Sequence, residues 1–184
     1  MTISKLKMMT LKALFVEIYY TDYSQDLTLS KIAEYIKAHE VVEIEYFELF
    51  DHDTDHKSLL LGLIQRVDVN FSVNSIEAEI LAAHYFLNVL KKYQVGEIRP
   101  FELCKIFNNI EAGFMGAPRN LDSKIVYSPS WLGNLYDACD WCDETWTHDN
   151  SPHLLIEVEK QIHNIKNWLT NPVLNNSDFD SNSI

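Results

Sequence analysis

Residues 74–96 read NSIEAEILAAHYFLNVLKKYQVG, and this stretch decides the fold class. Apolar residues recur there every three or four positions, which is the spacing of one face of an α-helix. Asn74 followed three residues later by Glu77 predicts a capping box at the start, and Gly96 predicts a left-handed cap at the end. We therefore expect one long helix, with His84 as a core histidine on its apolar side.

The same helical spacing extends along most of the chain. Pro100 is typical of a first-turn proline for a helix that ends at Gly113, and Ser151-Pro152 predicts the start of a last helix ending near Leu169. Asp53 or Asp55 is expected to cap the short helix that follows it. Further helices are predicted around Leu11 to Tyr19, after a cap at Thr28 or Ser30 with a continuation through Tyr46 and Leu49, and from near Pro129 through 135–150.

Together these patterns predict an all-α, single-domain bundle of about seven helices. Residues 66–73 (RVDVNFSV) alternate in polarity, so one short irregular or β-like stretch is expected there. The helical domain is expected to span 1–170, followed by a polar, proline-broken tail at 171–184 that we expect to be frayed.

The chain of 184 residues has a formal net charge of -12. This charge repels phosphate backbones and anionic lipid headgroups, so neither nucleic acid nor a membrane surface is an expected partner. The three cysteines, an odd number, and the interruption of the first apolar run by Glu17 indicate a cytoplasmic protein without a secretion signal. No cofactor is expected, and no feature of the sequence specifies an oligomeric state.

Two stretches carry acidic residues without any Lys or Arg: 40–55, with seven, and 137–149, with five. Like charges three or four residues apart on a helix repel each other, so such runs predict a use that compensates the cost. Tryptophan among the carboxylates would supply an apolar anchor, and the carboxylates would steer a basic partner. The candidate partner-binding residues are Glu43, Asp51, Asp53, Asp55, Asp140, Trp141, Asp143, Glu144 and Trp146.

A metal-binding or enzymatic protein that uses Cys139, Cys142, His148 and His153 is the first alternative. Cys139 and Cys142 form C-x-x-C, and His148 and His153 follow, all of them residue types that bind zinc. Only five residues separate Cys142 from His148, however, whereas a zinc finger needs about a dozen. On a helix the two cysteines would stand at i and i+3, which favours one core cysteine and one near the surface.

The sequence gives little support to a calcium-binding loop or to an enzymatic activity. Asp51, Asp53 and Asp55 imitate the start of a calcium loop, but His56 stands where the loop needs glycine and Gly62 where it needs glutamate. No nucleophile elbow, phosphate-binding loop, dinucleotide fingerprint or H-E-x-x-H motif occurs, so no enzymatic activity is predicted.

Two stretches resemble a known family. LKKYQVGEIRPFELCKIFNNIEAGF (90–114) resembles the helix–turn–helix of small α-helical bacterial immunity proteins. WLGNLYDACDWCDETWT (131–147) is similar to the late segment of immunity proteins from polymorphic-toxin and contact-dependent growth inhibition loci. The resemblance implies a cytoplasmic antitoxin that binds a cognate toxin domain, a basic protein and often a nuclease. An acidic regulatory protein for another basic partner is the remaining alternative.

Overall fold

The computed structural model describes residues 5–21, 23–41, 44–50, 55–73, 75–113 and 135–172. In these ranges every regular element is a helix, which confirms the predicted all-α fold. The elements are α1 (Lys5–Tyr20), α2 (Gln25–His39), the 3₁₀ helix η1 (Ile44–Phe50), α3 (His56–Gln65), α4 (Ile76–Gln94), α5 (Pro100–Gly113), α6 (Leu135–Cys139) and α7 (Pro152–Thr170). The tail predicted to be frayed lies, from residue 173 onward, outside the described residues.

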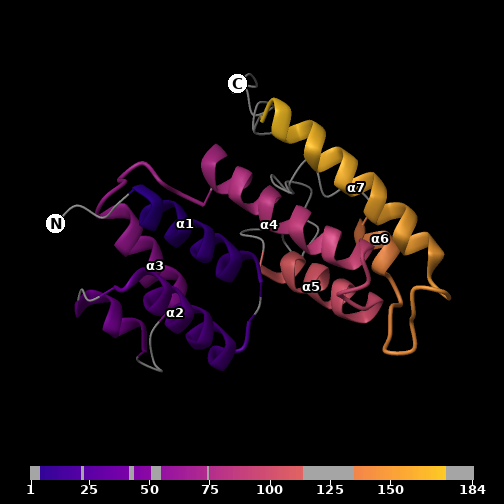
Figure 1. Ribbon diagram of the computed structural model, residues 1–184, viewed down its shortest axis with the longest axis horizontal. Helices are drawn as coiled ribbons and strands as arrows, with labels where there is room; N and C mark the ends of the chain where they lie inside the picture. Colours follow the sequence, from indigo (N-terminus) through magenta and orange to yellow (C-terminus); the bar gives the residue numbers. More distant parts are fainter. Residues whose placement is uncertain are drawn as a thin grey trace, which may run out of the picture. The chain divides into compact units, whose positions relative to one another are not determined.

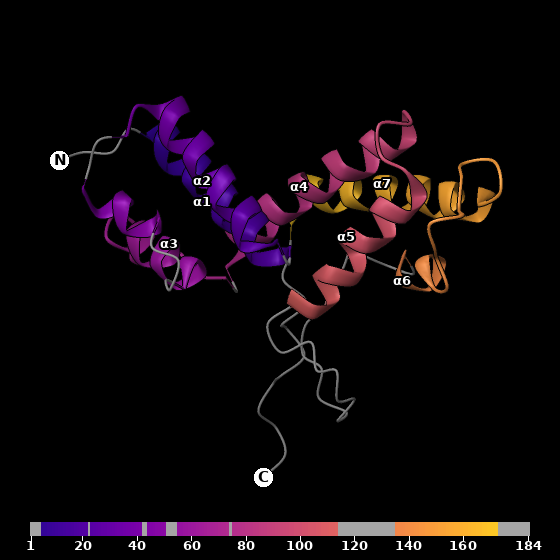
Figure 2. The ribbon, with the colours of Figure 1, turned by 90° about the horizontal axis from the view of Figure 1, so that it is seen from below.

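The chain forms two compact units, Met1–Ala82 and Ala83–Ile184, and α4 contributes residues to both. Figures 1 and 2 show α1, α2 and α3 in the first unit and α5, α6 and α7 in the second. The prediction of a single domain over 1–170 stays a prediction, and each unit is described by itself below.

The core of the first unit is built on α1, which packs against α2 and α3. Leu11, Phe15 and Ile18 are almost fully buried on the predicted face. The 3₁₀ helix η1 packs against α2 and α3 and buries Tyr46 and Leu49. Those two residues were expected on a continuation of α2, but α2 ends at His39, where Glu40 takes a left-handed conformation (φ 49°).

The helix caps of the first unit agree in part with those predicted from the sequence. Asp55 caps α3, accepting hydrogen bonds from the backbone N–H groups of Lys57 and Ser58, as predicted. The expected cap of α2 at Thr28 or Ser30 is wrong: Ser24 caps this helix, and Thr28 is buried inside it. The apolar period of α2 begins late because its first turn is solvent-exposed, so the periodicity alone did not mark the start.

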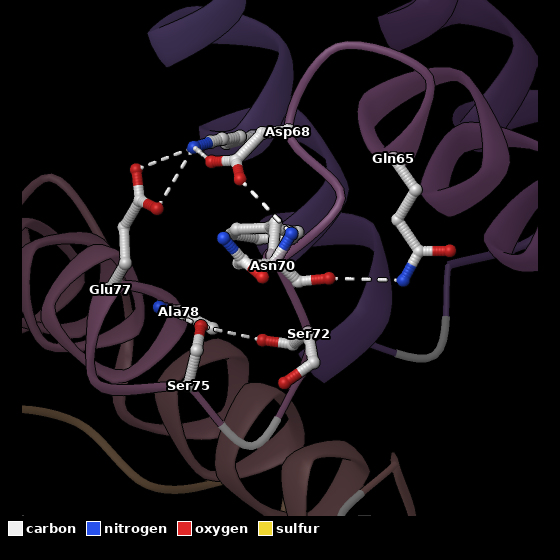
Figure 3. Close-up of polar contacts among 9 residues, drawn as sticks. Gln65, Asp68, Asn70, Ser72, Ser75, Glu77 and Ala78 are labelled. Atoms are coloured by element: carbon white, nitrogen blue, oxygen red, sulfur yellow. Dashed lines mark hydrogen bonds and ion pairs between the residues drawn. The ribbon is translucent and has the colours of Figure 1, made fainter.

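Residues 66–73 are irregular, with no strand pairing, and side-chain bonds order them. Asp68 accepts from the backbone N–H of Asn70, and Gln65 Nε2 donates to the carbonyl of Phe71, which is buried (Figure 3). The neighbouring valines, Val67 and Val69, are exposed. The alternating polarity of 66–73 therefore belongs to a loop that buries one aromatic ring, and not to a β-strand with one face buried.

Lys12 of α1 joins this loop to the start of α4. Its Nζ lies 2.7 Å from Asp68 Oδ2 and 2.8 Å from both carboxylate oxygens of Glu77, and 4.9 Å from the centre of the Phe71 ring. Figure 3 shows Asp68 and Glu77 pointing toward the same nitrogen. Burial lowers the pKa of Lys12, but the hydrogen bonds and charges of Asp68 and Glu77 outweigh burial and raise it above its ordinary value.

The predicted capping box at Asn74 and Glu77 falls partly outside the described residues, which include Glu77 but not Asn74. Glu77 binds Lys12, and the Ser75 hydroxyl accepts from the Ala78 N–H at the start of α4; Asn74 lies outside the described residues. In the described residues, Glu77 thus has a long-range partner in Lys12, and Ser75 supplies the hydrogen bond at the start of α4.

The end of α4 follows the prediction. Gly96 has φ +80°, and the Glu97 N–H donates to Lys92 O at 2.8 Å, closing the helix with the expected left-handed cap. In the second unit, Phe86 of α4 packs on Phe107 of α5 with ring centres 5.7 Å apart. The prediction of a core histidine on α4 is wrong, because His84 is exposed and does not lie among the buried residues of this helix.

The predicted helix through 135–150 is also wrong, beyond its first turn. The described part of this region begins with α6, which holds only residues 135–139, and the chain then runs through turns to Ser151. The start expected near Pro129 lies outside the described residues. Figures 1 and 2 show the segment between α6 and α7, in orange, as a loop in both views.

Candidate partner-binding surface

Residues 140–150, called the acidic loop below, leave the helix at a tight turn. The Cys142 N–H donates to Cys139 O at 3.1 Å, and Trp141 inside this turn has φ 64°. The Asp140 side chain accepts from the Trp141 N–H, and Asp143 Oδ1 accepts from the Thr145 N–H at 2.8 Å and from its hydroxyl at 2.5 Å. Aspartate side chains that bond the backbone nearby compete with helix formation, which explains why the predicted helix ends here.

The carboxylates of the acidic loop face solvent. Asp140, Asp143, Glu144 and Asp149 are all exposed. The hydrogen bonds from Thr145 hold the pKa of Asp143 below its ordinary value, so this side chain is fully ionised at neutral pH. Because these residues lie on turns, the predicted repulsion between helical neighbours Asp140 and Glu144 does not apply; what remains is a local excess of negative charge.

The two tryptophans of this region differ. Trp141 is 87% exposed, whereas Trp146 is partly buried and meets the His153 ring edge-on, with ring centres 5.0 Å apart. Of the two candidate anchors, Trp146 therefore has a ring contact within the protein, and Trp141 is the exposed one. An exposed indole at a strained backbone position is unusual, and such strain occurs most often at functional sites.

No basic side chain neutralises this charge within the described residues. The ion pairs there join Lys12, Lys31, Arg99 and Lys160 to carboxylates outside the acidic loop. The sequence contains no Lys or Arg between Lys124 and Lys160. The loop thus combines a large exposed apolar ring with carboxylates that have only neutral hydrogen-bond donors.

The other predicted acidic stretch belongs to the first unit. Glu43, Asp51 and Asp53 lie outside the described residues. Asp55 is exposed, but both of its oxygens are occupied: Oδ1 by the start of α3 and Oδ2 by the Ser58 hydroxyl at 2.6 Å. The bonds from Ser58 lower the pKa of Asp55. The main contact of Asp55 is therefore with the start of α3. The exposed candidates that remain are neighbours in the acidic loop: Asp140, Trp141, Asp143 and Glu144.

Three cysteines gather beneath the loop, one of which the sequence did not indicate. The thiol of Cys104 on α5 interacts with the thiols of both Cys139 and Cys142. Cys104 and Cys139 are buried and Cys142 is partly exposed, which confirms the prediction of one core and one near-surface cysteine in C-x-x-C. Cys104 lies 35 residues before Cys139, so no local motif could have revealed it.

The thiols of Cys104 and Cys142 stay protonated at neutral pH. Burial and the bond to Cys104 raise the pKa of Cys142 to about 12, and the bond to Cys139 together with burial raises the pKa of Cys104 well above its ordinary value. Because the thiolate is the reactive form, this environment is the opposite of the one that activates a cysteine nucleophile.

The histidines of the alternative metal site have other contacts. His148 stacks on the Tyr93 ring and His153 meets Trp146. Among the residues described here, no group of three or more His, Cys, Asp or Glu side chains is arranged to hold a metal ion. The four residues Cys139, Cys142, His148 and His153 are therefore not brought together as one ligand set.

Comparisons of the chain with protein-family models, with curated proteins and with solved structures find no match. The helices in the described ranges include none that is both long and apolar enough to span a lipid bilayer. Arguments about function therefore rest on the residues of this chain.

Proposed function

We propose that this chain is an immunity protein that binds a basic cognate toxin domain in the cytoplasm through the acidic loop. One observation carries the proposal: Trp141 is 87% exposed among carboxylates that no Lys or Arg of the described residues neutralises. The resemblance of 90–114 and 131–147 to immunity proteins agrees with it. The protein acts by binding, without an enzymatic step of its own.

The chemistry of the loop fits a cationic protein surface. Exposed carboxylates attract lysine and arginine at long range and speed association, whereas the buried area at an apolar anchor slows dissociation. The Trp141 ring can fill an apolar pocket or lie against an arginine guanidinium, which stacks on aromatic faces. Asp140, Asp143 and Glu144 surround this ring in the sequence and supply the acceptors.

A nuclease is the toxin class that this charge favours. A nuclease must attract a polyanion, so its substrate groove is basic. A loop with several ionised carboxylates competes for the same groove, and a ring such as Trp141 occupies the place of a stacked base. Binding there would exclude the nucleic acid and block the reaction.

The test is a charge reversal with a matched control. In the triple variant Asp140→Lys, Asp143→Lys and Glu144→Lys, we expect association with the toxin domain encoded next to this chain to slow by about 100-fold at low salt, and its salt dependence to weaken. The control Glu34→Lys, Glu97→Lys and Glu159→Lys makes the same change of charge at exposed positions outside the loop. Stopped-flow kinetics at several salt concentrations measures both.

Two results would contradict the proposal. If no basic toxin domain binds the wild-type chain, the immunity function is wrong. If the loop variant and the control variant slow association equally, net charge alone acts and the acidic loop is not the binding surface.

A further inference from the structure

The acidic loop is ordered by its own hydrogen bonds before any partner is present. Asn150 Oδ1 accepts from the Thr147 N–H at 2.7 Å, and Asn150 Nδ2 donates to Thr145 O at 3.1 Å. The Ser151 hydroxyl donates to Thr147 O at 2.5 Å. These bonds shape the second half of the loop and tie it to Ser151 at the start of α7, but they do not reach α4.

His148 provides the attachment to α4. Its ring stacks on that of Tyr93, with centres 4.6 Å apart and planes 24° apart. With the proton on Nε2, the ring also donates to Tyr93 O at 3.3 Å. Tyr93 is fully buried near the end of α4, so this contact joins the exposed loop to a rigid part of the second unit across 55 residues of sequence.

Tyr93 is itself held firmly. The side chain is fully buried, and burial raises its pKa, an effect that Ser151 partly offsets, so the hydroxyl is neutral at physiological pH. Because the His148–Tyr93 hydrogen bond is long, ring stacking carries most of the attachment. The other side-chain contacts of the loop, Trp146 on His153 and Cys142 on Cys104, reach α7 and α5.

We infer that His148 is a positioning residue, which holds the acidic loop against α4 so that Trp141 and its carboxylates meet a basic partner already ordered. The inference rests on the proposed function for the partner, but the ordering of the loop is a property of the free protein. A loop that is ordered beforehand loses less conformational freedom on binding, and a binding-competent state that is only partly populated weakens the apparent affinity in proportion.

The experiment compares His148→Ala, His148→Phe and the control His163→Ala, an exposed histidine on α7. Amide hydrogen exchange is measured on the free full-length chain. In His148→Ala we expect exchange at 140–150 to quicken by about tenfold, with α7 unchanged. His148→Phe keeps a ring that stacks on Tyr93 and should exchange like the wild type.

Binding is then measured with an arginine decapeptide as the basic probe. We expect His148→Ala to bind it about three- to tenfold more weakly. His148→Phe and His163→Ala should bind as the wild type does. The phenylalanine variant separates positioning from a direct contact, because it lacks both ring nitrogens.

Three outcomes overturn the inference: unchanged exchange in His148→Ala, faster exchange in His148→Phe, or unchanged probe affinity in a variant whose loop exchanges faster. The proposed function fails differently. If the triple lysine variant binds the toxin domain normally while His148→Ala loosens the loop, the loop is positioned by His148 but is not the binding surface.

Discussion

Two groups of acidic side chains, one in each unit, have opposite surroundings. In the first unit, Asp68 and Glu77 converge on the buried ammonium of Lys12. In the second, Asp140 and Asp143 bond only backbone N–H groups and a threonine hydroxyl. The first arrangement neutralises part of its charge and joins α1 to the start of α4, whereas the second keeps its charge and places it in solvent. Acidic side chains thus join two elements at Lys12, whereas those of the acidic loop have no cationic partner among the described residues.

The difference also concerns the aromatic rings. Phe71 lies buried under the Lys12 ammonium, while Trp141 stands exposed among carboxylates. The face of the Phe71 ring is already occupied by a cation of the same chain. A ring surrounded by unneutralised carboxylates is the complement of a cation that another molecule brings.

Removal of Lys12 gives the largest expected change in stability. Lys12→Met should lower the free energy of unfolding by about 1–3 kcal/mol, because Asp68 and Glu77 lose their shared partner although both retain partial access to water. Chemical denaturation monitored by circular dichroism measures the effect. The control is Lys37→Met, an exposed lysine on α2. Equal loss in both variants would show that the Lys12 contacts do not stabilise the first unit.

A smaller effect is expected at Trp141, with the opposite sign. Trp141→Gly should raise the free energy of unfolding by about 0.5–1 kcal/mol, since glycine adopts φ 64° without the strain that a side chain brings. Trp141→Ala keeps the strain and should leave stability unchanged. Both variants should lose toxin binding. A Trp141→Gly variant that is less stable than the wild type would mean that the ring packs on the protein and is not free for a partner.

The smallest effects concern the pKa values of the two kinds of aspartate. Hydrogen bonds lower the pKa of Asp68 through Lys12 and that of Asp143 through Thr145. A lowered folded-state pKa contributes stability that is complete above the unfolded value and is lost as pH falls through the folded value. We expect Lys12→Met to raise the pKa of Asp68 alone and Thr145→Val to raise that of Asp143 alone, as followed by NMR titration of the carboxyl groups.

A shift of both carboxyl groups in either variant would link the two regions and contradict their independence. With the wild type, the lowered pKa of Asp143 also predicts that toxin binding persists as pH falls from 7 to 5, because this carboxylate stays ionised there.

The sequence by itself determined the helices and several of their ends. The end of α4 at Gly96, the start of α5 at Pro100, the cap of α3 at Asp55 and the start of α7 at Pro152 are all local effects of backbone conformation or of hydrogen bonds between near neighbours. The net charge of -12 is likewise a property of composition. Such features depend on a few adjacent residues, so they can be predicted without knowledge of the fold.

The tertiary structure decided which carboxylates and rings are used internally. Glu77 bonds a lysine 65 residues away, Cys142 interacts with Cys104, and His148 stacks on Tyr93. The expected helix through 135–150 gave way to turns that leave Trp141 outside. Partners so far apart in sequence are chosen by how the helices pack, because a side chain forms its strongest contacts with the groups that packing brings near it, and sequence spacing does not specify those groups.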